Sequence, residues 1–149
     1  MTSATLRPAR AADRAAVAAL LAGASLPSDL EADWFPALAV VAERGDRVVG
    51  AAAFERAGDA ALLRSVVVAP GARAAGLGAR LVVDRLAAAR AAGMRRAFLL
   101  TLDAAPWFAR LGFRAIARDA VPGAIAATRE FASLCPATAA CLARDLADG

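Results

Sequence analysis

The chain has 149 residues and a net charge of +4, and all 18 of its basic residues are arginine. This length fits one domain, residues 1–149, with a substantial hydrophobic core. The arginines are scattered along the chain, whereas nucleic-acid-binding proteins gather their basic residues in a stripe. We therefore expect no nucleic-acid partner.

The sequence contains no stretch of 18 apolar residues without charge, which argues against a membrane-spanning helix. Its N-terminus lacks the basic region and apolar core of a signal peptide. Both observations favour a cytoplasmic protein with no membrane partner. Cys135 and Cys141 are then expected to be free thiols. Two thiols in a chain without histidine make a poor metal site, so we expect no metal.

The first predicted elements are a short strand, Thr5–Pro8, and a helix, Ala11–Ala24. Apolar residues recur at helical spacing through the second of these segments. Asp13 lies in its first turn, and Gly23 ends it.

A second short helix is predicted over Asp29–Phe35. Ser28 precedes it as a candidate N-cap, and Glu31 follows three residues later, which is the spacing of a capping box. Pro36 would end this helix, because proline cannot continue the helical hydrogen-bond pattern.

Three β-rich runs come next, at Ala39–Glu43, Arg47–Arg56 and Ala60–Ala69. The pairs Gly45-Asp46 and Gly58-Asp59 separate them. Because two-residue turns of this kind join antiparallel strands, the three runs predict an antiparallel meander.

A long helix, Leu77–Ala92, then leads to the short apolar run Arg96–Thr101. A strand that follows a crossover helix lies parallel to the strand before that helix. We therefore expect Arg96–Thr101 to lie beside Ala60–Ala69.

Four shorter elements complete the chain: a helix over Ala104–Leu111, a strand over Phe113–Arg118, a helix from Pro122 through Phe131, and a last strand over Thr138–Leu142. The whole pattern predicts an α/β fold with a mixed, mostly antiparallel sheet of six to seven strands flanked by helices.

The most informative segment precedes the long helix and reads Arg73-Ala74-Ala75-Gly76-Leu77-Gly78. A glycine-rich turn before a helix presents backbone N–H groups and the positive end of the helix dipole to a phosphate. Gly76 and Gly78 allow a diphosphate to approach the backbone, and Arg73 adds a guanidinium. The alternative is a glycine-rich helix entry that binds nothing.

The spacing excludes two other phosphate loops. A Walker loop ends in Gly-Lys-Ser/Thr, and the chain has no lysine. A dinucleotide-binding fingerprint needs a third glycine, and Leu81 occupies that position.

The Arg-x-x-Gly-x-Gly turn, the order of the elements and the segment Trp107–Phe113 resemble the GNAT acetyltransferases over nearly the whole chain. The resemblance implies a GNAT-like fold, acetyl-CoA as cosubstrate and a homodimer. It also implies that the backbone of Val66 and Val68 pairs with the pantetheine arm, although either valine would equally serve as a core residue. The implied cofactor-binding residues of the loop are Arg73, Ala74, Ala75, Gly76, Leu77, Gly78 and Ala79.

Four segments look like the arsenic-resistance N-acetyltransferases within GNAT, namely Leu62–Val68, Phe98–Thr101, Phe108–Phe113 and Thr128–Pro136. This closer resemblance implies acetyl transfer to the amine of a small, amino-acid-like acceptor, with an organoarsenical as one candidate. The strand end Leu100–Asp103 departs from the family, because it lacks a run of threonines.

The acceptor amine must lose a proton before it attacks the thioester. Glu55 is the first candidate for this base, and its alternative is a strand-end charge paired with Arg56 or Arg64. Asp103 is the second candidate, and its alternative is a cap for the following helix.

The thiolate product must gain a proton. Phe108 stands where many GNAT enzymes carry a tyrosine for this step, and the chain contains no tyrosine or histidine. Water, the amine's own proton or the hydroxyl of Ser65 remains for that role.

Arg64 lies inside an apolar run, where an unpaired charge is costly, so it must have a partner. An acidic group of the acceptor fits its planar fork, and the alternatives are a salt bridge to Glu55 or an outward-facing position. Trp34 is a candidate wall of the acceptor site or a packing residue. Thr101 and Asp103 complete the predicted acceptor site.

Two other functions stay open at this stage. The lack of tyrosine and histidine fits a sensor module that binds acetyl-CoA without catalysis. An enzyme that acetylates protein N-termini would instead need an open acceptor groove.

Overall fold

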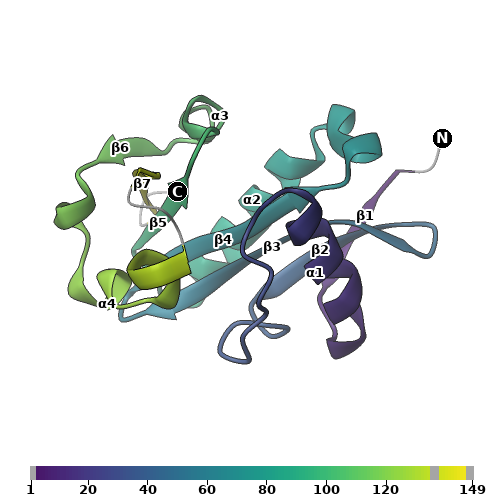
Figure 1. Ribbon diagram of the computed structural model, residues 1–149, viewed down its shortest axis with the longest axis horizontal. Coiled ribbons are helices and arrows are strands. Elements are labelled where there is room, and N and C mark those ends of the chain that lie inside the picture. The colour runs from purple at the N-terminus through teal and green to yellow at the C-terminus, as the bar shows by residue number, and fades with distance from the viewer. Residues whose placement is uncertain (1–2, 135–137, 147–149) are drawn as a thin grey trace. The chain divides into compact units, whose positions relative to one another are not determined.

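The computed structural model describes residues 3–134 and 138–146 (Figure 1). Its strands form a seven-stranded sheet in the hydrogen-bonded order β1-β2-β3-β4-β5-β7-β6, which confirms the predicted fold class. The strands are β1 (Thr5–Pro8), β2 (Ala39–Arg44), β3 (Arg47–Ala57), β4 (Ala60–Val68), β5 (Arg96–Thr101), β6 (Arg114–Ile116) and β7 (Ala140–Asp145).

The helices among the described residues comprise four α-helices, three 3-10 helices and one π-helix. They are η1 (Ala11–Asp13), α1 (Arg14–Gly23), η2 (Pro70–Ala75), α2 (Leu77–Ala91), α3 (Ala105–Ala109), η3 (Arg118–Ala120), α4 (Gly123–Ala126) and the π-helix η4 (Glu130–Leu134). None of these described helices is long and apolar enough to cross a membrane.

Two compact units divide the chain. The first unit consists of Met1–Glu55 and Arg64–Ala88, and the second of Arg56–Leu63 and Ala89–Gly149. Strands β3 and β4 and helix α2 each contribute residues to both units.

The three runs of the predicted meander form β2, β3 and β4, which are successive neighbours in the sheet. Within the first unit, β2 pairs antiparallel with β3 and also with β1. The β2–β3 hairpin turns at Gly45 and Asp46, and Gly45 supplies the positive φ of +63° that such a turn needs. A register shift between Ala42 and Glu43 places a bulge in this pair of strands.

Helices α1 and α2 cover opposite faces of β2 and β3 (Figure 1). Val41 of β2 packs in the cluster that contains Leu21 of α1, whereas its neighbour Val40 packs with Leu81 of α2. This alternation follows from the two-residue period of a strand. Gly50 of β3 allows α2 to approach closely, because a Cβ there would meet Cδ1 of Leu81 at 3.0 Å.

The predicted helix over Asp29–Phe35 is wrong. Isolated turns occupy this segment, with N–H groups of Trp34 and Phe35 donating to the carbonyl of Glu31. Trp34 and Phe35 are each 1% exposed and pack in the core cluster of α1. A helix of seven residues is marginal on its own, so burial of these two aromatic side chains in the core overrides the local signal.

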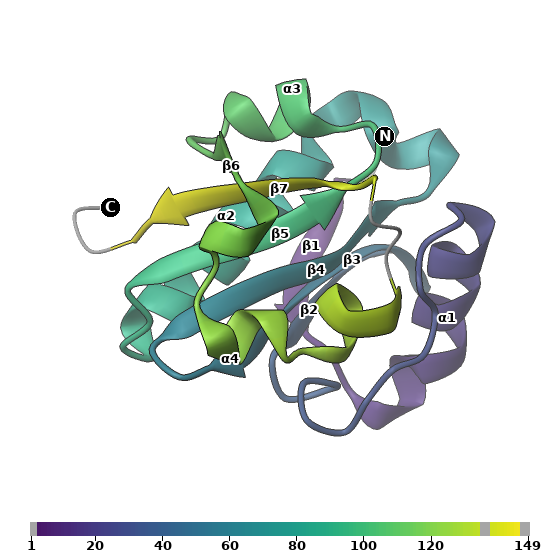
Figure 2. The same ribbon diagram turned by 60° about the vertical axis from the view of Figure 1, so that its left-hand side comes forward.

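In the second unit, β4 and β5 are parallel, as the crossover predicts. Their pairing runs over residues 60–62 of β4, although β4 itself continues to Val68. Strand β7 pairs antiparallel with both β5 and β6 and lies between them (Figure 2). Leu62, Phe98, Ile125 and Cys141 are central residues of the core cluster in this unit.

The predicted helix from Pro122 through Phe131 is interrupted. It forms as α4 and η4, separated at Thr128, whose hydroxyl donates to the carbonyl of Ile125 at 2.7 Å. Such side-chain hydrogen bonds compete with the helical pattern. The other late elements form with shifted ends: α3 and β6 are shorter than predicted, and β7 extends to Asp145.

An ion-pair network joins β1, η1 and β2 in the first unit. Nη1 and Nη2 of Arg7 donate to the two carboxylate oxygens of Asp13, both at 2.9 Å, and Nη2 also donates to Glu43 at 3.2 Å. The Asp13 carboxylate accepts the Arg10 N–H at 2.7 Å. Chiefly because of the Arg7 hydrogen bonds, the pKa of Asp13 lies below its ordinary value, and the same contact raises the pKa of Arg7.

Asp13→Asn is expected to lower the free energy of unfolding by about 1.5–3 kcal/mol near neutral pH, because it removes charge-assisted hydrogen bonds from a buried carboxylate. Since the pKa of Asp13 is lowered on folding, its contribution is present above the ordinary pKa and is lost as the pH falls through the folded-state value. Urea unfolding from neutral to acidic pH should therefore show a steeper loss of stability in the wild type than in Asp13→Asn.

The control is Glu43→Gln, which removes the more exposed partner of Arg7 and should cost less than about 1 kcal/mol. Parallel pH profiles for the wild type and Asp13→Asn would contradict the assignment.

Candidate active site

The predicted phosphate loop lies between β4 and α2 in the first unit. Residues Pro70–Ala75 form the 3-10 helix η2, whose i→i+3 hydrogen bonds engage part of the loop's N–H groups. Gly76 is left-handed, with φ of +68°, and its carbonyl accepts the N–H of Arg80 at 3.2 Å. Leu77, Gly78 and Ala79 form the first turn of α2. The backbone N–H groups in the first turn of a helix have no acceptor within that helix. Donors for an anion are therefore concentrated at this turn.

Arg73 adds positive charge beside this turn. Its side chain is exposed, and Nε donates to the carbonyl of Val68 at 3.0 Å. Ala74 and Ala75 follow it within η2. Buried Ala72 and Leu77 anchor the two ends of the loop in the core cluster of α2, so the loop is held by packing on both sides.

A change of alternation in β4 separates the two predicted functions of this strand. Ser65 has φ of +58°, a left-handed conformation that is uncommon for a residue other than glycine. Arg64 and Val67, three residues apart, both face the α1 side, while Val66 and Val68 pack on the α2 side. Backbone of this kind gathers at functional sites, where the surrounding structure holds it in place.

The side chain of Arg64 is fully buried in the first unit, at 0% exposure. Its Nη1 donates to Oε1 of Glu55 at 2.5 Å, and its Nε donates to Oγ of Ser65 at 3.3 Å. Its Cζ lies 4.2 Å from the ring centroid of Trp34, and Oε1 of Glu31 lies 3.9 Å from Nη1. We call Arg64, Glu55, Glu31 and Trp34 the Arg64 cluster.

Two buried donors of this cluster, Nη2 of Arg64 and Nε1 of Trp34, have no hydrogen-bond partner among the described residues. Buried N–H groups are rarely left unpaired, because each unmade hydrogen bond costs free energy. An oxyanion is the acceptor that best fits a guanidinium and an indole N–H. The cluster also holds two carboxylates against one guanidinium, which favours a cationic amine nearby.

The structure thus brings together four of the predicted catalytic and acceptor residues: Glu55, Arg64, Ser65 and Trp34. The internal salt bridge between Arg64 and Glu55, one of the alternatives for both residues, is present. Glu55 keeps part of its side chain exposed, at 15%, so its carboxylate remains within reach of water.

Thr101 and Asp103 belong to the second unit. The hydroxyl of Thr101 accepts the N–H of Ala104 at 3.1 Å. Asp103 is exposed, and Ala104 occupies the N-cap position of α3, so Asp103 does not cap this helix.

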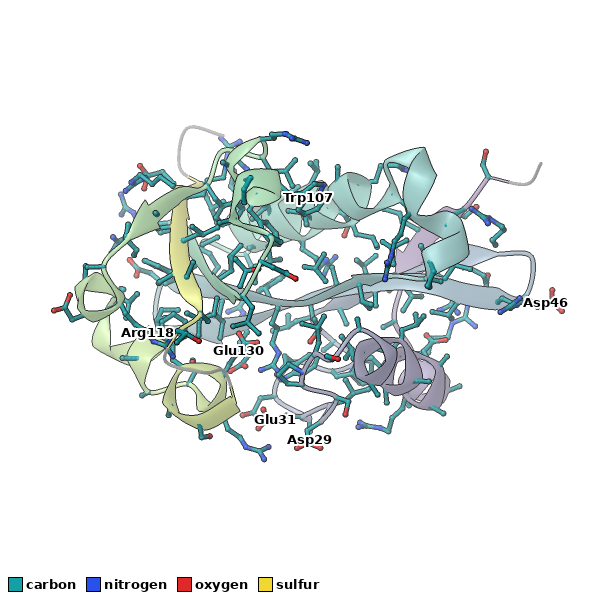
Figure 3. All side chains as sticks on the ribbon, turned by 45° about the horizontal axis from the view of Figure 1, so that its top comes forward. Asp29, Glu31, Asp46, Trp107, Arg118 and Glu130 are labelled. Carbon is teal, nitrogen blue, oxygen red and sulfur yellow. The ribbon has the colours of Figure 1, made fainter. Side chains whose placement is uncertain are left out.

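Glu31 is the residue of the cluster that the sequence did not reveal. Its position suggested a capping box, but its carboxylate lies next to Arg64 instead. Figure 3 labels Glu31 and Asp29 on the segment that follows α1. The signal that points to it is the buried arginine itself, because a guanidinium has more donors than one carboxylate can satisfy.

Among the residues that the structure describes, no three histidine, cysteine, aspartate or glutamate side chains are grouped closely enough to hold a metal ion. Cys141 is a buried free thiol, and burial raises its pKa. Cys135 lies outside the described residues.

The acetyltransferase (GNAT) domain is the family whose model matches the chain, over residues 36–115. No curated protein sequence matches the chain significantly. Solved structures do match its fold.

The N-acetylglutamate synthase of Neisseria gonorrhoeae, complexed with coenzyme A and N-acetyl-glutamate, superposes with a TM-score of 0.82 at 23% identity, over 98% of this chain and 36% of that chain. Rv2747 of Mycobacterium tuberculosis, in complex with CoA and NLQ, gives 0.79 at 23% identity, over 95% and 98%. A GNAT-family acetyltransferase of Staphylococcus aureus Mu50 gives 0.75 at 14% identity, over 97% and 99%.

The chain spans about a third of the length of the gonococcal synthase and nearly all of the other two proteins. The TM-scores show that these three proteins share the fold of this chain, and at such low identities they show the fold alone. The family match is stronger evidence, because it covers more than half of the chain, including η2, Gly76 and the start of α2. On this match, the chain belongs to the GNAT acetyltransferase family.

Proposed function

We propose that this protein transfers an acetyl group from acetyl-CoA to the amine of a small, amino-acid-like acceptor that carries an acidic group. The observation that carries the proposal is the Arg64 cluster, in which buried donors without partners lie beside two carboxylates. This arrangement offers binding groups for both charges of an amino acid.

Acetyl-CoA binding is supported by the loop of the first unit. The first turn of α2 offers the N–H groups of Leu77, Gly78 and Ala79 to the diphosphate, and Arg73 supplies a guanidinium. The backbone of Val66 and Val68 is the candidate partner of the pantetheine arm. Two of the superposed proteins, the gonococcal synthase and Rv2747, are in complex with coenzyme A, which supports this assignment.

Acceptor binding follows from the charges of the cluster. Arg64 and Trp34 donate to the acid group of the acceptor, and the carboxylates of Glu55 and Glu31 attract its amine. An organoarsenical amino acid carries the same two charged groups, so we propose it as one member of the acceptor class. The gonococcal N-acetylglutamate synthase is complexed with N-acetyl-glutamate, the N-acetylated form of an acidic amino acid, which supports this acceptor class.

Chemistry then requires a neutral amine, whereas an α-amino group is mostly protonated at neutral pH. Glu55 relays the amine proton to water, and the amine attacks the thioester carbonyl, which the backbone N–H of Val66 polarises. The new C–N bond forms as the C–S bond breaks. Water or Ser65 protonates the CoA thiolate, and the products are the N-acetylated acceptor and free CoA.

Release of free CoA thiol tests the proposal directly. The purified protein is incubated with acetyl-CoA and a panel of amines: L-glutamate, neutral amino acids, amino-acid amides, and organophosphorus or organoarsenic amino acids. Amine-dependent CoA release, with highest kcat/KM for acidic acceptors, supports an enzyme. Binding of acetyl-CoA with no CoA release from any amine would instead indicate a sensor module.

Glu55→Gln is expected to lower kcat/KM for the acceptor more than 10-fold, about 1.4 kcal/mol, while the dissociation constant of acetyl-CoA stays unchanged. The reason is that the amide cannot take a proton from the amine. The control is Asp46→Asn, which removes a carboxylate from the exposed β2–β3 hairpin (Figure 3). Equal kinetics in the wild type and Glu55→Gln would remove Glu55 from the mechanism.

Gly76→Ala is expected to weaken acetyl-CoA binding about fivefold or more, because a left-handed conformation costs an L-residue about 1–2 kcal/mol. The matched control is Gly71→Ala in the same loop, where an added Cβ meets nothing within 4 Å and φ is not positive. Calorimetric titration with CoA measures both variants. An equal loss of affinity in the two variants would contradict the prediction that the left-handed conformation of Gly76 is needed for cofactor binding.

A further inference from the structure

The contacts of Arg64 leave one of its guanidinium nitrogens unpaired. Nε donates to Oγ of Ser65 at 3.3 Å, and Nη1 donates to Oε1 of Glu55 at 2.5 Å. Oε1 of Glu31 lies 3.9 Å from the same Nη1. Nη2 has no hydrogen-bond partner among the described residues, and neither has Nε1 of Trp34, whose ring lies against the guanidinium. The carboxylates therefore lie at Nη1, and the unpaired nitrogen of the same guanidinium is Nη2.

Covalent geometry fixes how far apart these two ends of the guanidinium lie. Nη1 and Nη2 are bonded to the same carbon, so the groups that they bind are close neighbours. An amine attracted by the Glu55 carboxylate and an acid group bound to Nη2 must then lie side by side. In an α-amino acid the amine and the carboxylate are attached to one carbon. The side-chain acid of glutamate, by contrast, lies two carbons further from the amine.

Burial favours the same spacing. Nη2 of Arg64 and Nε1 of Trp34 are covered by protein atoms, whereas the side chain of Glu55 is 15% exposed. An amine at Glu55 therefore stays nearer to water than an acid group that pairs with the two donors. The covering side chains must shift to admit that acid group, and a carboxylate directly beside the amine requires the smallest shift. A carboxylate on a longer, flexible spacer also loses more conformational entropy on binding.

We infer that the acid group bound by Arg64 and Trp34 is the α-carboxylate of the acceptor, which makes the acceptor an α-amino acid acetylated on its α-amine. Arg64 and Trp34 are then specificity-determining residues, and an acid in the acceptor's side chain is not the group that they bind. This inference rests on the proposed function, because it takes the Arg64 cluster as the acceptor site.

The two donors discriminate against an amide at the α position. A carboxylate offers two acceptor oxygens, whereas a carboxamide offers one oxygen beside an NH2 group that only donates. A carboxamide also lacks the negative charge that pairs with a guanidinium. A buried site that is built to hydrogen-bond one group rejects an analogue without it, because its own polar groups are then left unpaired.

The isomers L-glutamine and L-isoglutamine test the inference, because they contain the same atoms and the same kinds of charged group. L-Glutamine keeps the α-carboxylate and has an amide in its side chain. L-Isoglutamine has the amide at the α position and the acid in its side chain. Ligand-dependent shifts in melting temperature give both dissociation constants, in the presence of free CoA so that no acetyl transfer occurs. L-Glutamine should bind at least about 10-fold more tightly than L-isoglutamine.

Trp34→Phe tests the indole donor, because phenylalanine keeps an aromatic ring against Arg64 and has no N–H. This variant should lower the preference for L-glutamine over L-isoglutamine about threefold or more. Trp107→Phe is the matched control, since it makes the same change in α3, outside the Arg64 cluster, and should leave the preference unchanged. The melting temperature without ligand shows whether each variant is folded.

Equal affinity for the two isomers, tighter binding of L-isoglutamine, or no binding of L-glutamine would each overturn the inference. This comparison uses the wild-type protein, so it decides the inference even if a variant does not fold. An equal loss of preference in Trp34→Phe and Trp107→Phe, or no loss in either, would overturn the assignment of Trp34.

CoA release from acetyl-CoA separates this inference from the proposed function. Turnover of both isomers with equal kcat/KM contradicts the inference and leaves the proposed enzyme in place. Selective binding of L-glutamine without CoA release from any amine contradicts the proposed enzyme and leaves the Arg64 cluster as a binding site for α-amino acids.

Discussion

The buried charge of Arg64 is the constraint on which the candidate site depends. A guanidinium with no exposed surface must be compensated where it lies, and Glu55, Glu31, Ser65 and the Trp34 ring all contact it. These partners come from three separate parts of the first unit: β3, β4 and the segment after α1. Compensation is incomplete, because Nη2 has no partner among the described residues. The same charge that orders the cluster therefore also leaves it able to bind an anion.

Backbone geometry at Ser65 directs neighbouring side chains of β4 to opposite faces of the sheet. The left-handed conformation of Ser65 allows Arg64 and Val67 to share the α1 face, while Val66 and Val68 face α2 and the phosphate loop. In a regular strand, Arg64 and Val66 would share a face. The change of alternation at Ser65 thus places the buried charge on the α1 face and the flanking valines on the α2 face, which is the separation that the proposed acceptor and cofactor sites require.

Local and periodic signals predicted most of the fold. The Gly-Asp turns specified the meander, and the crossover helix specified the parallel pairing of β4 with β5, because both depend on residues close in sequence. The segment 29–35 failed, since burial of Trp34 and Phe35 depends on α1 and on distant strands. The candidate site shows the same contrast between local signals and tertiary contacts. Arg64 and Glu55 were predicted from their unusual strand positions, whereas Glu31 meets Arg64 only through the tertiary fold.

Arg64 and Glu55, which the sequence indicated, and Glu31, which it did not, lie in different parts of the chain. The family match begins at residue 36 and covers Glu55, Arg64 and the glycine-containing loop before α2. Glu31 and Trp34 lie before it, on a segment held by packing and turns instead of a sheet ladder. A segment without regular structure changes its side chains at little cost to the fold. Substitutions at position 31 would therefore alter the charge beside Arg64 while the strands that carry Arg64 and Glu55 stay intact.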